Sequence, residues 1–168
     1  MANLFQNIGF QNALELIRPH ILEETVQIAW QLILTEFFPG RVGFKYGFKS
    51  PILANNNMPD AMVTEVRLLP VFPGGPLGWY EQQILLVECK RPSLDTPDGL
   101  EDTLTGQFED DLSQSLNHTG RLFGAIAIGT PKVRPLHPFP YDMQNAIGIA
   151  DVENELRRIR ATGWQWAA

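Results

Sequence analysis

The sequence of 168 residues has a single cysteine, Cys89, so no disulfide can form within the chain. Its first residues lack the basic end followed by an apolar run that an export signal requires. We therefore expect an intracellular protein, without distinguishing cytoplasm from nucleus. The longest apolar stretches, such as residues 28–34, are interrupted by Gln31 and fall well short of the ~20 residues that cross a bilayer. No membrane partner is expected.

Low-complexity and repeated stretches are also missing, and histidines are few. With 44% apolar and 19% charged residues, the composition is that of an ordinary globular protein. This length suits one complete core, which predicts a single domain over residues 1–168. The three histidines His20, His118 and His137 are too scattered for a zinc site, which normally shows paired ligands at short spacing.

An excess of basic residues is missing as well, because the net charge is −6. Broad coating of nucleic acid depends on lysines and arginines that neutralise phosphates, so this balance argues against such a surface. A carboxylate cluster that holds a divalent ion, however, counts as negative only until the metal binds. Any contact with nucleic acid should then be local and metal-assisted.

Apolar residues recur at helical spacing from residue 11 to residue 38 and predict a long helix. Pro19 is expected to divide it, since proline suits a first helical turn and not a helix interior. The main helix is therefore predicted from about Pro19 to Phe37, and Pro39 with the following glycine ends it.

Three strands are predicted next. Residues 42–49 alternate between apolar and polar side chains, which is typical of a half-buried strand. Residues 61–69 and 83–89 are separated by turn-forming residues and are predicted to form a hairpin with a long tip. The continuous apolar run 84–87 indicates a strand covered on both faces, which should be central.

The second half is predicted to contain a helix at residues 100–116 and a buried strand at 122–128. The proline-rich residues 131–142 are predicted to form an irregular surface loop, after which Asp151 should cap a short helix through about Thr162. The resulting order, α-β-β-β-α-β plus a carboxy-terminal helix, predicts an α/β fold with a mixed central sheet flanked by helices on both faces.

Chemistry-bearing residues lie at the strand ends. Asp60 begins the second strand, and Glu88 and Lys90 end the third. Because side chains alternate along a strand, Glu88 and Lys90 share a face and Cys89 points to the other. In a hairpin Asp60 can lie beside them. Two acids and a lysine there suit phosphodiester hydrolysis: both carboxylates and the Cys89 backbone carbonyl would hold Mg²⁺ or Mn²⁺, and Lys90 would orient or deprotonate a water.

This constellation, Pro59-Asp60 followed by Glu88-Cys89-Lys90 on that element order, resembles the PD-(D/E)xK nuclease superfamily. At the level of element order the resemblance covers roughly residues 19–128, but its motif comprises only these five positions. It implies a restriction-endonuclease-like fold, metal binding by the Asp and Glu, and catalytic assistance by the Lys. The interval of twenty-eight positions from Asp60 to Glu88 and the missing basic surface depart from the family pattern.

The resemblance also implies an acid on the first helix and, in the branch similar to recombination and repair nucleases, a glutamine on the helix after the motif. Glu24 is the chosen acid because it flanks the apolar seam, with Glu23 and Glu36 as rivals. Gln107 fits the glutamine, and Gln114 lies two turns later on the same side.

Several alternatives stay open. The first hypothesis is a metal-dependent nuclease acting on nucleic acid, most simply DNA; the second is a catalytically silent binding or scaffolding module, since a fold alone does not establish chemistry. A third is a small-molecule hydrolase with the same metal site. Trp164 and Trp166 are interpreted as covering the core or a dimer contact, which leaves a homodimer or a larger assembly open. The acidic run 109–111 is interpreted as a solvated helix face, and Cys89 as a small apolar packing residue.

Overall fold

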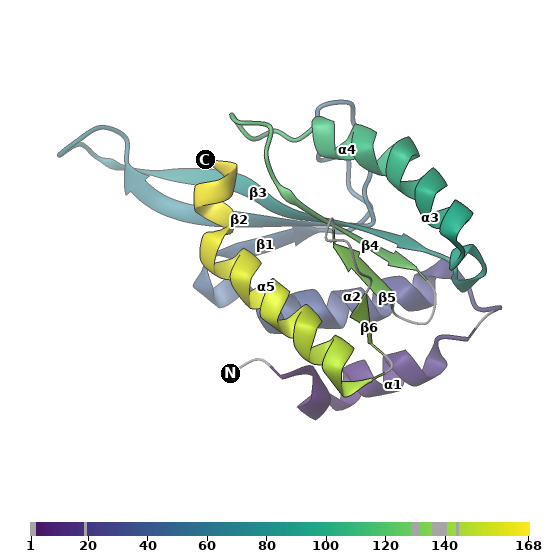
Figure 1. Ribbon diagram of the computed structural model, residues 1–168. Coiled ribbons are helices and arrows are strands. Elements are labelled where there is room, and N and C mark those ends of the chain that lie inside the picture. The colour runs from purple at the N-terminus through teal and green to yellow at the C-terminus, as the bar shows by residue number, and fades with distance from the viewer. Residues whose placement is uncertain (1–2, 19, 129–131, 136–140, 144) are drawn as a thin grey trace.

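The computed structural model describes residues 3–18, 20–128, 132–135, 141–143 and 145–168. Its helices and strands occur in the order α1 (Ile8–Leu16), α2 (Glu23–Phe37), β1 (Phe44–Gly47), β2 (Ala61–Pro70), β3 (Leu77–Lys90), α3 (Pro97–Thr103), α4 (Glu109–Ser113), β4 (Phe123–Ile128), β5 (Lys132–Pro135), β6 (Tyr141–Asp142) and α5 (Ala146–Ala167). A π-helical turn, Leu104–Phe108, joins α3 to α4. The predicted α/β class, a mixed open sheet flanked by helices, is confirmed (Figure 1).

Strand β3 lies inside the sheet because its residues are apolar on both faces. The strands are ordered β1-β2-β3-β4-β5-β6, and β3 pairs antiparallel with β2 and parallel with β4. A parallel neighbour requires a crossover connection, which α3, the π-turn and α4 provide. Residues 84–87 have no exposed surface, so the prediction of a central strand is confirmed.

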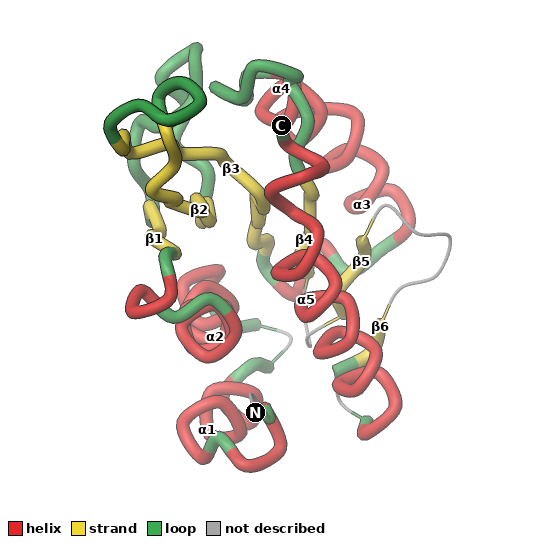
Figure 2. The backbone as a smooth tube through the Cα atoms, turned by 90° about the vertical axis from the view of Figure 1, so that its left-hand side faces the viewer, coloured by secondary structure: helices red, strands yellow, loops and turns green. Residues whose placement is uncertain are grey.

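The alternation of β3 divides the core into two halves. Leu85, Val87 and Cys89 belong to the core under α1, α2 and α5, whereas Leu86 belongs to the smaller core under α3 and α4. These two groups of helices lie on opposite faces of the sheet (Figure 1, Figure 2). It follows that Glu88 and Lys90, in phase with Leu86, belong to the α3–α4 side.

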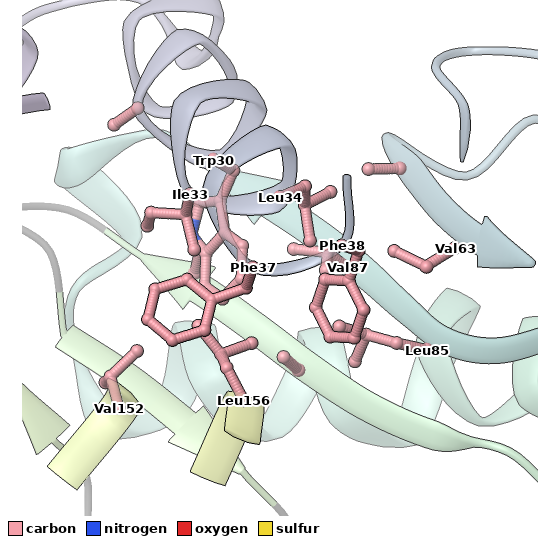
Figure 3. Packing of buried hydrophobic residues seen from close by; sticks show 14 of the residues in the cluster. Trp30, Ile33, Leu34, Phe37, Phe38, Val63, Leu85, Val87, Val152 and Leu156 are labelled. Carbon is pink, nitrogen blue, oxygen red and sulfur yellow. The ribbon is translucent and has the colours of Figure 1, made fainter. Parts of the chain in front are cut away.

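Helix α2 is fixed on the sheet by its apolar seam. Trp30, Ile33, Leu34 and Phe37 are each at most 2% exposed. They point from the helix into the space above β3, where Leu156 of α5 also lies (Figure 3). Burial of one large apolar side chain contributes roughly 1.5–3 kcal/mol, so this seam holds the helix firmly. The polar first turns of α2 are thereby fixed relative to the strands.

The β2–β3 hairpin extends well beyond the helices that cover the rest of the sheet (Figure 1). Its register runs from the pair Ala61 and Val87 near the body to the pair Pro70 and Leu77 at the tip. Strand β3 begins at Leu77 and not at residue 83 as predicted, because the tip continues the ladder with β2.

The predicted division of the first helical region is confirmed, although α2 begins at Glu23, later than predicted. Pro19 itself lies outside the described residues. Glu23 and Glu24 occupy the first turn of α2, where negative charge is favourable at the positive end of the helix dipole. The predicted strand 42–49 is shorter in the structure, where β1 comprises Phe44–Gly47.

The prediction of a helix at residues 100–116 is wrong at both ends. The helical path begins at Pro97, because the Thr96 side chain accepts a hydrogen bond from the Gly99 amide, and it ends at Ser113. Leu116, which was expected to continue the apolar repeat, is 64% exposed beyond the helix. The predicted strand at 122–128 is confirmed as β4.

The interpretation of residues 131–142 as an irregular loop is wrong where the structure describes them. Residues 132–135 form β5 beside β4, and residues 141–142 form β6 beside β5, while residues 136–140 lie outside the described residues. The last helix is also longer than predicted. Asn145 and not Asp151 is its cap, with its side chain accepting from the Gly148 amide at 2.9 Å.

Of the helices in the described ranges, none has the length and apolar character that crossing a membrane would require.

Candidate functional site

The hairpin register brings Asp60 to Glu88. Ala61, the residue after Asp60, pairs with Val87, the residue before Glu88, so Asp60 lies at the strand end close to Glu88. The Cys89 backbone N–H donates a 2.7 Å hydrogen bond to Asp60 Oδ2. Asp60 is therefore fixed at the strand end, beside the carboxylate predicted to act with it.

Glu88 and Lys90 form a partly buried ion pair on one face of β3. Lys90 Nζ donates to Glu88 Oε1 at 2.7 Å, and Glu88 is only 3% exposed. The other carboxylate oxygen, Glu88 Oε2, is buried and has no hydrogen-bond partner in the described part of the chain. A buried carboxylate oxygen without a partner is unfavourable, so this atom needs an explanation.

Burial raises the pKa of the Asp60 carboxyl above its usual value. The hydrogen bond from the Cys89 amide and the charges of Lys49 and Lys90 oppose this rise without cancelling it. Burial likewise raises the pKa of Glu88, and the neighbouring charge of Asp60 adds to the rise. Two carboxylates that are both hard to ionise thus lie within electrostatic reach of each other, a situation that a bound cation would relieve.

The ammonium group of the site remains protonated. Burial alone would lower the pKa of Lys90, but the hydrogen bond with Glu88 and the charges of Glu88, Glu23 and Asp60 together raise it. The pKa of Glu88 is raised despite this bond because Glu88 is more deeply buried than Lys90, whose side chain is 18% exposed. Lys90 therefore carries its charge at neutral pH.

Two residues that the sequence did not single out also contact Asp60. Gln27 Nε2 donates to Asp60 Oδ1 at 2.6 Å, and Lys49 Nζ lies 3.9 Å from the same oxygen. Gln27 also donates to Glu23, one turn earlier on α2. A polar pair spaced by four residues at the start of an apolar helix is the sequence signal that could have indicated Gln27. The sequence holds no comparable signal for Lys49.

The three candidate acids of the first helical region do not all lie near Asp60. Glu24 is exposed, and its charge raises the pKa of Asp60. Glu23 contacts Gln27, and its Oε1 lies 4.0 Å from Lys49 Nζ. Glu36 lies near the other end of α2, where it accepts from Asn7. Glu23 and Glu24 are thus on the site side of the helix and Glu36 is not.

Neither candidate glutamine has a described hydrogen bond to Asp60, Glu88 or Lys90. Gln107 is exposed on the π-helical turn, and its Nε2 lies 3.4 Å from Asp111 Oδ2. Gln114 directly follows α4, and its carbonyl accepts from the Ala54 amide. Among the described residues, Gln107 is connected to the site through Asp111, whose charge acts on Glu88.

Asp111 corrects the interpretation of residues 109–111 as a solvated face. Glu109 and Asp110 are exposed, but Asp111 has no exposed surface and accepts a 2.6 Å hydrogen bond from Asn57 Nδ2. Its charge contributes to the raised pKa of Glu88. The helical path breaks at Gly106 (φ −91°, ψ −116°), which changes the phase of the following turn. That change of phase accounts for an inward acid in a run that looks solvated.

The Cys89 thiol packs as an apolar residue, as predicted. It is 1% exposed, and burial raises its pKa well above the usual value. The thiol is consequently inert, and only the backbone of Cys89 is available to the site.

A hard divalent ion fits the donor set. In the described ranges no group of three or more His, Cys, Asp or Glu side chains gathers that could hold a metal ion. Mg²⁺, however, usually takes only one or two carboxylates and keeps several waters. The unpartnered Glu88 Oε2 and the raised pKa values of Asp60 and Glu88 fit such an ion.

Comparison of the chain with protein-family models, curated proteins and solved structures finds no match.

Proposed function

We propose that the protein is a metal-dependent nuclease of the PD-(D/E)xK type that hydrolyses phosphodiester bonds, most simply in DNA. One observation carries the proposal: the buried carboxylate of Glu88 has a lysine on one oxygen and no described partner on the other, and the second buried carboxylate, Asp60, is bonded to the backbone of the next residue, Cys89. Glu65 Oε2 is likewise buried without a hydrogen-bond partner, while Glu65 Oε1 pairs with Arg67, so the nearby second carboxylate of Asp60 is what distinguishes Glu88. The restriction-endonuclease-like arrangement of the hairpin, the crossover and β4 is part of this proposal.

Asp60 and Glu88, with the Cys89 backbone carbonyl, would hold Mg²⁺ or Mn²⁺. When bound, such an ion supplies Lewis-acid stabilisation and a water of lowered pKa. The chain itself supplies orientation. Asp60 is held by the Cys89 amide on one oxygen and by Gln27 on the other, so its carboxylate cannot rotate freely.

Lys90 is assigned the task of orienting water and offsetting negative charge on the phosphoryl oxygens. A general base must be able to give up its proton near the working pH. The neighbouring carboxylates raise the pKa of Lys90, so its charged form is available for an electrostatic role. A bound divalent ion would lower this pKa by charge repulsion, so proton abstraction stays open beside it.

The acidic balance of the chain limits how nucleic acid is bound. With a net charge of −6, extended coating of a duplex is unfavourable, and the substrate must be held mainly at the site. A divalent ion would neutralise the two carboxylates, so that the charge of Lys90 would leave the site locally positive.

The test is cleavage of single- and double-stranded DNA and RNA with Mg²⁺, Mn²⁺ or EDTA, comparing the parent with Lys90→Ala. We expect metal-dependent cleavage that falls by about 10²–10³-fold in Lys90→Ala, the size typical of losing one preorganised stabilising group. Lys45→Ala is the matched control, because Lys45 pairs with Glu81 away from the site. No cleavage of any substrate by a parent that binds metal would favour the silent scaffold instead.

A further inference from the structure

Lys49 is held beside the site by an unusual backbone. It follows β1 with φ +44°, one of two non-glycine residues in the described ranges with positive φ. Its amide donates to the carbonyl of Pro59 at 3.1 Å, next to Asp60. Residues held in sparsely populated backbone regions tend to cluster at functional sites. The backbone thus keeps this lysine next to the amino end of β2.

The ammonium of Lys49 is held loosely, in contrast to that of Lys90. Its Nζ lies 3.9 Å from Asp60 Oδ1 and 4.0 Å from Glu23 Oε1, and both distances exceed hydrogen-bond length. The Lys49 side chain is 52% exposed, whereas that of Lys90 is 18% exposed. An exposed pair at such distances is weak, so Lys49 can leave Asp60 at little cost.

Each carboxylate of the site therefore has its own lysine, one tight and one loose. A divalent ion that takes both carboxylates replaces the counter-charge of both lysines, because positive charges repel one another. Lys90 is confined by burial, but Lys49 is free to move toward solvent.

We propose that Lys49 is an anchor for a backbone phosphate of the substrate, released from Asp60 when the metal binds. This inference rests on the proposed function and names the group that recognises the nucleic-acid strand. Before metal arrives, Lys49 shields Asp60; afterwards it presents its charge to an anionic phosphate oxygen at the mouth of the site. Metal binding would thereby prepare substrate binding.

Loss of the Lys49 charge should change metal binding and nucleic-acid binding in opposite directions. Because Lys49 competes with the metal for Asp60, removing its charge should tighten metal binding. Because Lys49 contacts phosphate, the same change should weaken binding of nucleic acid. A lysine that only stabilises the fold would not produce this combination.

The experiment measures both changes in Lys49→Gln. Calorimetric titration with Mn²⁺ should show about two- to five-fold tighter binding than the parent, the range expected from a weak exposed pair. Anisotropy of an end-labelled 20-base-pair DNA duplex in Ca²⁺, across a salt series, should show weaker binding. The slope of log affinity against log salt should become about 0.9 shallower, as for the loss of one phosphate contact.

Three further variants complete the design. Lys49→Arg should restore the salt slope, because it restores the charge. Lys49→Asn replaces Lys49→Gln if the latter folds poorly, since asparagine tolerates positive φ. Lys45→Gln, from the same strand region and of similar exposure, should change neither measurement.

The outcomes separate the two proposals. If the parent binds Mn²⁺ and duplex and Lys49→Gln keeps the parental salt slope, the anchor is overturned and the nuclease proposal stands. If the parent binds neither, both are overturned. Tighter Mn²⁺ binding together with a shallower slope supports the anchor.

Discussion

The two ends of the β2–β3 hairpin differ: one end buries charged side chains, and the other exposes large apolar ones. At the body end, the charged residues Asp60 and Glu88 are buried, at 8% and 3% exposure. At the tip, the large apolar residues Phe72, Leu77 and Trp79 are exposed, at 59%, 58% and 73%. Buried charge and exposed apolar surface are the informative exceptions in a folded protein, and one hairpin carries both.

The comparison shows that an unusually placed side chain can be interpreted only where the groups around it are known. At the body end each charged group has a named neighbour, and the unpartnered Glu88 Oε2 indicates what is missing. At the tip nothing in the structure shows what would cover the apolar side chains. Chemistry can therefore be assigned to one end and not to the other.

Removing Lys90 should give the largest effect on stability. In EDTA, Lys90→Ala leaves the buried Glu88 carboxylate without its cation. The free energy of unfolding should fall by about 3–5 kcal/mol. Protonation of Glu88 offsets part of this loss. Mn²⁺ should restore most of that loss, because the metal replaces the missing charge. Thermal melts with and without Mn²⁺ measure both quantities. If the loss persists in saturating Mn²⁺, no ion reaches Glu88.

Mn²⁺ should stabilise the parent protein by binding at the Asp60 and Glu88 end of the hairpin. A ligand bound only by the native state at one hundred times its dissociation constant adds about 2.7 kcal/mol. Glu88→Gln should abolish this gain, because an amide is a poor ligand for a hard cation. Melting curves in Mn²⁺ decide the matter: equal shifts in the parent and in Glu88→Gln would place the bound ion elsewhere.

Without metal, stability should fall as pH rises. In the folded state the pKa values of Asp60 and Glu88 are raised above their ordinary values of 3.8 and 4.5. In the pH range between the ordinary and the raised pKa values, the folded state therefore binds more protons than the unfolded state. The stability present below about pH 4 is lost as pH increases through the folded-state pKa values. Melts in EDTA from pH 4 upward should show this slope.

Glu88→Gln is the variant that sharpens the pH prediction. It should reduce the slope and melt higher than the parent at neutral pH in EDTA, where each 1 kcal/mol corresponds to about 2–4 °C. Glutamine still offers an oxygen to Lys90, and its amide occupies the position that has no partner in the parent. A lower melting temperature for Glu88→Gln in EDTA would mean that the buried charge stabilises the fold, contrary to this account.

Substitution at the tip should have the smallest effect. Trp79→Ser removes a side chain that is 73% exposed, so the change in stability should stay within about 0.5 kcal/mol. The Mn²⁺ shift should equal that of the parent. A large loss of stability, measured by denaturant titration, would show that the tip packs against something in solution.

Much of the fold could be predicted from local patterns. The apolar run 84–87 and the alternation around it indicated the central strand, and the same alternation set Glu88 and Lys90 on one face. Asp60 could be added because a hairpin brings its two strand ends together. These inferences depend only on the period of a strand and the connection between two strands.

The remaining parts of the site depend on tertiary packing. Gln27 reaches Asp60 because a buried seam fixes α2 on the sheet, and Lys49 reaches it because a positive φ turns the chain after β1. Asp111 faces inward because the helical phase changes at Gly106. Of these effects only that of Gln27 has a local signature, its spacing of four residues from Glu23, and this spacing does not by itself name Asp60 as the partner.

The most direct test is the anomalous scattering of Mn²⁺ in crystals of the parent protein. The account predicts a strong anomalous peak in contact with the carboxylates of Asp60 and Glu88, with Glu88 Oε2 as a ligand. A map with no peak there at millimolar Mn²⁺, while Lys90 remains bonded to an otherwise unchanged Glu88, would contradict the central claim that this buried pair is a metal site.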